Sequence, residues 1–162
     1  MWKTSWKFSE LSENFPLTTA PKGGIIKAQR TKEVMNMKIY LASPLFTEYE
    51  RNNVATVAQY LRSRGHQVYV PMEHTIENAW GLENHDWAKR VFDEDVKAIR
   101  ECDEVHCLYY GLYSDSGTAW ECGFAYGIGK PVVLVDNANE EVSLMMVNGA
   151  QNPSDFYSKN QT

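Results

Sequence analysis

Hydrophobic positions along residues 37–149 alternate between two patterns. Short apolar runs predict four strands, at residues 37–43, 66–72, 104–111 and 130–137. Between and after them, apolar residues recur at helical spacing and predict helices at residues 46–65, 85–102, 116–129 and 140–149. Strands that alternate with helices favour right-handed crossovers and a parallel sheet. The expected fold class is therefore α/β, a doubly wound, mainly parallel sheet in a flavodoxin- or Rossmann-like three-layer sandwich.

Residues 1–36 show a different pattern. Their aromatic residues are scattered among polar ones, and a stretch with Pro and Gly but no period follows. We expect an N-terminal appendage at 1–36, either flexible or docked through its aromatics, and a catalytic domain at 37–162.

The chain contains no apolar run near the roughly 18 to 20 residues that cross a bilayer and no apolar signal segment near its start, so we expect no membrane partner and a cytoplasmic location.

Composition narrows the class of ligand. Hydrophobic residues make up 43% of the chain and charged residues 23%, as in globular proteins, and the net charge is −5. Without a dense Lys/Arg stripe, this charge argues against a nucleic-acid partner and favours a small ligand with little charge. The three cysteines lack metal-ligand spacing, and His74 and His85 near Glu73 lack a third ligand, so we expect reduced thiols and no metal.

A doubly wound sheet binds ligands beyond the carboxyl ends of its strands. This rule places residues 43–46, the loop from residue 71, residues 109–117 and residues 136–139 around one crevice. Ser43 and Gly117 are candidate substrate-binding residues in these loops, and Gly117 also permits close approach of another group. The loop at 73–86 carries side chains suited to base recognition, so base preference depends on it.

Glu121 has two interpretations. Thr118 and Glu121 match a capping box, in which the glutamate reaches back to a backbone amide at the helix start. Alternatively, a carboxylate in the first turn of a helix that begins at the crevice is favoured in its ionised form by the helix dipole, and is a plausible nucleophile.

Two aspartates accompany it. Helical geometry places Asp95 in the middle of the apolar stripe of its helix, where burial raises the pKa of a carboxyl group. An acid with a raised pKa beside an ionised carboxylate suits glycoside chemistry, although a buried Asp that only satisfies a loop amide fits equally well. Asp115 precedes the third helix, where an N-cap or turn role is at least as plausible as a catalytic one.

The stretches IYLASPLF (39–46), FDEDVKAIRECDEV (92–105) and DSGTAWECGFAYGIGKPVVLV (115–135) resemble the nucleoside 2-deoxyribosyltransferase family in order and spacing. The resemblance implies that Glu121 is the nucleophile and that Tyr40 orients it. It also implies that Asp95 and Asp115 contact and protonate the base, and that Phe46 packs on it. The implied reaction is a ping-pong exchange between a 2'-deoxynucleoside and a free nucleobase without cofactor or metal, in a homo-oligomer with shared active sites.

The resemblance is incomplete near the C-terminus. The transferases carry an asparagine just before a Leu-Met pair, where this chain has Ser143. The related 2'-deoxynucleoside 5'-monophosphate N-hydrolases carry a serine in that region, where it helps to hold the 5'-phosphate, so Ser143 is a further candidate substrate-binding residue. Their Gly- and Arg-bearing first loop, however, is absent from SPLFTEYERNN. We expect a transferase for free nucleosides, with a monophosphate N-hydrolase or a non-catalytic nucleotide-binding module as alternatives.

Overall fold

The computed structural model describes residues 6–7, 36–74, 76, 81, 83–111, 114–136 and 142–151. They form a parallel sheet in the order β1-β5-β4-β2-β3. The strands are β1 (Trp6–Lys7), β2 (Lys38–Ala42), β3 (Gln67–Tyr69), β4 (Glu104–Tyr109) and β5 (Val132–Asp136). The chain moves from β2 outward to β3 and then returns past β2 to β4, so the strand order reverses between β2 and β4. This topology confirms the predicted doubly wound α/β fold.

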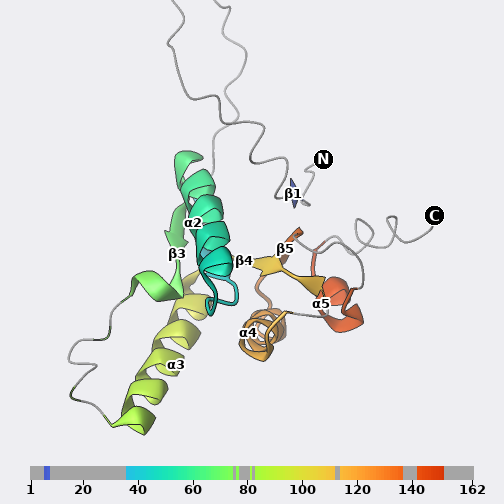
Figure 1. The fold of residues 1–162 in the computed structure, drawn as a ribbon. Coiled ribbons are helices and arrows are strands. Elements are labelled where there is room, and N and C mark those ends of the chain that lie inside the picture. Colours follow the sequence, from blue (N-terminus) through green and yellow to red (C-terminus); the bar gives the residue numbers. More distant parts are fainter. Residues whose placement is uncertain are drawn as a thin grey trace, which may run out of the picture.

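Helices cover both faces of the sheet (Figure 1). One face packs against α2 (Glu48–Ser63), and the other against α3 (Asn84–Glu101), α4 (Ser116–Gly127) and α5 (Leu144–Gly149). Alternation within β2 divides its side chains between the two cores. Ile39 and Leu41 join the core under α2, whereas Tyr40 and Ala42 join the core under the other three helices. Tyr40 therefore faces the layer that contains α4.

The predicted elements differ from the observed ones mainly at their ends. The 3-10 helix η1 (Pro71–Glu73) follows directly after Val70, so β3 is shorter than predicted. The last helix begins at Leu144 rather than at residue 140. β1 is a strand that the sequence pattern did not predict, and it pairs in parallel with β5. Because residues 8–35 lie outside the described residues, the division of the chain at residue 36 stays a prediction.

The first half of α3 is exposed. Trp87 and Phe92 are 46% and 51% accessible, and Ile99 near the other end is the buried residue of this helix. The predicted apolar stripe is thus only partly covered within one chain, and Asp95 lies half-buried rather than deep in a core. Among the described helices, none combines the length and apolar character required to cross a membrane.

Candidate active site

The carboxylate of Glu121 is held by a tyrosine from the neighbouring layer. Tyr40 lies in β2, fully buried, and its hydroxyl donates a hydrogen bond to Oε1 of Glu121 in α4 at 2.8 Å. Burial and the nearby carboxylates of Glu121 and Asp95 raise the pKa of Tyr40. The phenol therefore stays protonated and remains a donor at any physiological pH. This contact joins two residues that are 81 positions apart in the chain.

The capping-box interpretation of Glu121 is wrong. The N-cap of α4 is Asp115, and the helix starts at Ser116, so Glu121 is the sixth helical residue and lies in the second turn. At that position its side chain is beyond the free amides of the helix start. It points to Tyr40 instead, and its carboxylate is available at the side of α4 that faces the sheet.

Burial sets the protonation of Glu121. The pKa of Glu121 is raised to about 7, mainly by removal from water; the hydrogen bond from Tyr40 lowers this pKa, and the charges of Asp95 and Asp115 raise it. A carboxylate with this pKa is partly ionised at neutral pH. It is also less solvated than a surface carboxylate, which favours attack on a carbon centre.

Asp95 is the second carboxylate of the site. The Tyr69 hydroxyl lies 3.5 Å from Oδ1 of Asp95, at the outer limit of a hydrogen bond. Desolvation raises the pKa of Asp95 to about 6; the bond from Tyr69 lowers it, Glu94 raises it and His74 lowers it. Asp95 thus retains its proton to a higher pH than a surface aspartate, as expected of an acid that protonates a leaving group.

The two tyrosines form a stacked pair. Tyr40 and Tyr69 are direct partners in the register of β2 and β3, and their ring centroids lie 5.5 Å apart at an interplanar angle of 14°. The ring of His74 stacks on Tyr69 at 3.9 Å and 7°. Each tyrosine hydroxyl contacts one carboxylate, so the stack connects the surroundings of Glu121 with those of Asp95.

Asp115 caps α4. Its Oδ1 accepts a hydrogen bond from the Gly117 amide at 2.6 Å, and its Oδ2 accepts from the amide and the hydroxyl of Thr118. A Cβ at Gly117 would lie 2.9 Å from Oδ1 of Asp115, so the group that approaches Gly117 closely is the capping carboxylate itself. The charge of Asp115 reaches Glu121, but its contact with a base stays a prediction.

The loop between β2 and α2 binds a carboxylate of the protein itself, that of Glu50. The amides of Phe46 and Thr47 donate to Oε2 of Glu50 at 2.9 and 2.7 Å, and Thr47 with Glu50 forms a capping box at the start of α2. Arg51 donates to the carbonyls of Leu45 and Phe46. The amides and the guanidinium that a phosphate would use are therefore engaged with protein groups.

The other predicted substrate-binding residues lie in this loop and near α5. Ser43 donates to the carbonyl of Pro44, and the Phe46 side chain is 77% exposed, so it is accessible to a ligand. Ser143 is the N-cap residue of α5 without a side-chain capping bond, and its amide donates to the hydroxyl of buried Tyr109. Substrate contacts of all three stay predictions.

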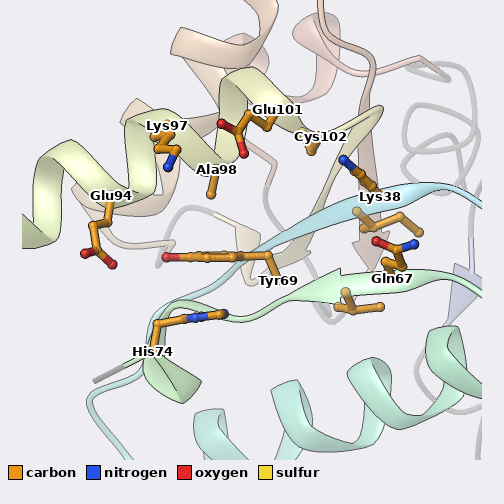
Figure 2. Close-up of a pocket in the computed structure, with 11 residues that line it drawn as sticks. Lys38, Gln67, Tyr69, His74, Glu94, Lys97, Ala98, Glu101 and Cys102 are labelled. Carbon is orange, nitrogen blue, oxygen red and sulfur yellow. The ribbon is translucent and has the colours of Figure 1, made fainter. Parts of the chain in front are cut away.

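A cavity of about 440 Å³ lies between α3 and the edge of the sheet, and Tyr69 and His74 are among the residues that line it. Figure 2 shows the Tyr69 ring parallel to the His74 ring below it, with Glu94 and Lys97 of α3 above. Asp95 and Glu121 do not line this cavity. Residues 75, 77–80 and 82 of the predicted base-recognition loop lie outside the described residues, as do residues 112–113 and 137–139 of the predicted crevice.

Comparisons with known proteins agree on one family. Residues 39–156 match the family described as Nucleoside 2-deoxyribosyltransferase. A nucleoside deoxyribosyltransferase of Limosilactobacillus fermentum is 26% identical over 145 residues, which cover 79% of this chain and 86% of that protein. The structure of a 2-deoxyribosyltransferase from the psychrotolerant bacterium Bacillus psychrosaccharolyticus is 33% identical, with a TM-score of 0.62, and the match covers 77% of this chain and 92% of that one. A conserved protein of Enterococcus faecalis V583 is 29% identical with a TM-score of 0.54, over 61% and 62% of the two chains.

Proposed function

Because the chain belongs to the nucleoside 2-deoxyribosyltransferase family, we propose that it exchanges the base of a 2'-deoxyribonucleoside through a covalent deoxyribosyl-Glu121 intermediate. The observation that carries this proposal is the hydrogen bond from Tyr40, which holds the Glu121 carboxylate away from its own helix amides. A second carboxyl group with a raised pKa, on Asp95, is close enough for its charge to act on Glu121.

In the first half-reaction, a carboxylate oxygen of Glu121 attacks the anomeric carbon of the deoxyribose. The glycosidic bond breaks, its electron pair leaves with the base, and Asp95 donates its proton to that base. The products are the free base and a deoxyribosyl ester of Glu121. During attack, Tyr40 orients the carboxylate through its hydroxyl.

In the second half-reaction, a ring nitrogen of an incoming base attacks the anomeric carbon of the ester. The ester bond breaks, the Glu121 carboxylate is released, and Asp95 takes up the proton of the incoming base. Two displacements at one carbon give net retention of configuration. The scheme uses no metal and no cofactor, and it divides one difficult displacement into two easier ones.

The first loop supports a free nucleoside as the substrate rather than a 5'-monophosphate. A phosphate dianion is bound in proteins by amide N–H groups and guanidinium groups. Here the loop amides bind the carboxylate of Glu50, and Arg51 binds loop carbonyls. A 5'-phosphate in this loop would meet the Glu50 charge without its usual partners.

The monophosphate N-hydrolase remains the second candidate because of Ser143. It stands at the N-cap of α5 without a capping bond, so its hydroxyl is available for a substrate oxygen. Water in place of the second base would complete hydrolysis with the same Glu121 ester.

A nucleotide-binding module without catalysis is the third possibility, and the pairing of Tyr40 with Glu121 argues against it because binding alone does not require an oriented carboxylate.

We further propose that the protein, in the cytoplasm as expected from its sequence, forms a homo-oligomer with shared active sites. Large apolar side chains are exposed on the three helices of one face, and they comprise Trp87, Phe92, Trp120, Tyr126, Leu144 and Met145. Trp120 also contacts Phe92 and Phe124 in a continuous aromatic group across α3 and α4. Light scattering that gives the mass of one chain would contradict this part of the proposal.

Product analysis by chromatography tests the function. The protein is incubated with 2'-deoxyinosine plus excess adenine, with 2'-deoxyinosine alone, and with deoxynucleoside monophosphates alone. We expect 2'-deoxyadenosine in the first mixture and its loss with Glu121→Ala. Release of base from the monophosphates alone would favour the N-hydrolase, and the absence of turnover across a panel of bases would contradict both enzymes.

A further inference from the structure

The geometry around Asp95 points to a further role for Tyr69, a residue that lies on the edge strand β3. We propose that Tyr69 is a positioning residue for Asp95, and that the stacked rings of Tyr40 and Tyr69 align the nucleophile and the acid as one unit. This inference rests on the proposed function. It adds a residue whose effect on the reaction passes through the orientation of Asp95.

The register of β2 with β3 explains why the side chains of Tyr40 and Tyr69 lie side by side. Cα partners on adjacent strands point to the same face of a sheet, so the side chains of Tyr40 and Tyr69 project side by side toward α3 and α4. Each hydroxyl then reaches a carboxylate of a different helix. Tyr40 contacts Glu121 of α4, and Tyr69 contacts Asp95 of α3.

The ring of Tyr69 is fixed from both sides. Tyr40 covers one face and His74 covers the other, with interplanar angles of 14° and 7°. Tyr69 also lines the cavity in Figure 2, so the ring is not enclosed by a complete core. Stacking on the rings of Tyr40 and His74 therefore restricts the orientation of the Tyr69 ring, whereas full burial restricts that of Tyr40.

The hydroxyl of Tyr69 is a permanent donor. Burial and the charges of Asp95 and Glu94 raise its pKa to about 12, so it remains protonated over the working range of the enzyme. Its 3.5 Å contact with Asp95 is long in the free protein. Catalytic hydrogen bonds commonly shorten when substrate binds, which is when the orientation of the acid matters.

Several charged or titratable groups act on Asp95, and a test must separate Tyr69 from them. Glu94 on the same helix and His74 after η1 act on it electrostatically, and the charge of Asp95 in turn acts on Glu121 and Tyr40. Tyr69→Phe leaves these groups and both ring contacts in place and removes one oxygen atom. Tyr60 of α2, on the opposite face of the sheet, gives a matched control, Tyr60→Phe.

The expected results for Tyr69→Phe are a fall in kcat of about tenfold and a change in KM below about twofold. The hydroxyl lowers the pKa of Asp95, so its removal lets Asp95 keep its proton longer, and the basic limb of the pH profile moves to higher pH. A substitution that only loosened packing would not move this limb. Tyr60→Phe should change neither kcat nor the limb.

A double-mutant cycle tests whether Tyr69 acts through Asp95. In an Asp95→Asn background, Tyr69→Phe should cause no further loss, because the group that it positions has lost its acid function. Equal losses with and without Asp95 would overturn the inference.

A readout without substrate separates this inference from the proposed function. NMR titration of the side-chain carboxyl carbons in the free protein should show a higher pKa for Asp95 in Tyr69→Phe than in the unaltered chain. An unchanged Asp95 titration overturns the role of Tyr69 even if base exchange occurs. A shifted titration in a protein that turns over no nucleoside shows the contact between Tyr69 and Asp95 but overturns its catalytic meaning along with the proposed function.

Discussion

The hydroxyl of Tyr40 donates to the carboxylate of Glu121 at 2.8 Å, across the interface between β2 and α4. Tyr40 is fully buried, so its position is fixed by the core of the sheet rather than by a loop. Glu121 is thereby oriented by a rigid element before any substrate binds. Catalytic groups held in this way lose little conformational freedom in the reaction.

The pH profile follows from two carboxyl groups with raised pKa values. Glu121, with a pKa of about 7, must be ionised to attack, so the ionised fraction of Glu121 falls as the pH drops below that value. Asp95, with a pKa of about 6, must be protonated to act as an acid, so the protonated fraction of Asp95 falls as the pH rises above that value. The profile of kcat/KM should therefore be a bell centred near pH 6.5. At that pH, roughly one molecule in twenty has Glu121 ionised and Asp95 protonated at the same time. Activity that still rises at pH 8.5 would exclude this assignment.

Tyr40→Phe should move the acidic limb of that bell. The hydrogen bond from Tyr40 lowers the pKa of Glu121, and without it burial raises that pKa further above 7. Activity at pH 6 should then fall by about tenfold or more, and the loss at pH 8 should be smaller. The comparison uses initial rates of base exchange at the two pH values. Equal losses at both would mean that Tyr40 does not act through ionisation of Glu121.

Asp115 offers a way to separate capping from catalysis. Asp115→Ala removes the acceptor for the amides of Gly117 and Thr118, and should lower the free energy of unfolding by about 1 kcal/mol. Asp115→Asn keeps a capping oxygen and should retain most of that stability. Denaturant unfolding measures the stabilities, and exchange rates are taken in parallel. If Asp115→Asn is stable but inactive, the carboxyl group also serves the reaction; if it is stable and active, capping is its function.

Glu50 should disfavour substrates that carry a 5'-phosphate. Glu50→Gln keeps an oxygen acceptor for the amides of Phe46 and Thr47 while it removes the negative charge. The ratio of kcat/KM for the nucleoside to that for its monophosphate should therefore fall by about threefold to tenfold. Competition between the two substrates in one mixture measures this ratio directly. A ratio that does not change would mean that the phosphate binds elsewhere.

The sequence predicted the fold and the main pair of the site for different reasons. The strands β2, β4 and β5 are apolar runs that are buried on both faces, which is the strongest pattern that a parallel sheet produces. Tyr40 and Glu121 were identified by resemblance to a family, because nothing in their spacing of 81 positions indicates a contact. The rule that a doubly wound sheet binds ligands beyond the carboxyl ends of its strands placed only the strand of Tyr40 and the helix of Glu121 at the same edge of the sheet.

The errors arise where two local patterns compete. Asp115 and Thr118 are both residue types that cap helices, and the match of Thr118 with Glu121 to a capping box competed with the cap that Asp115 provides for the helix predicted to start at residue 116. Tyr69 was not predicted as part of the site because its role depends on the register of β2 with β3 and on the ring of His74. A tyrosine at the carboxyl end of one strand, in register with a tyrosine within the neighbouring strand, is the signal that could have identified it.

The decisive experiment traps the deoxyribosyl ester on Glu121. The protein is mixed with a 2'-deoxynucleoside in the absence of an acceptor base, quenched rapidly in acid, digested and analysed by mass spectrometry, with Glu121→Gln treated in parallel. If Glu121 is the nucleophile, the peptide that contains it gains the mass of one deoxyribosyl group, the adduct disappears when adenine is added before the quench, and the variant forms none. A protein that exchanges bases without any adduct, or with an adduct on another residue, would contradict the assignment of Glu121 as the nucleophile.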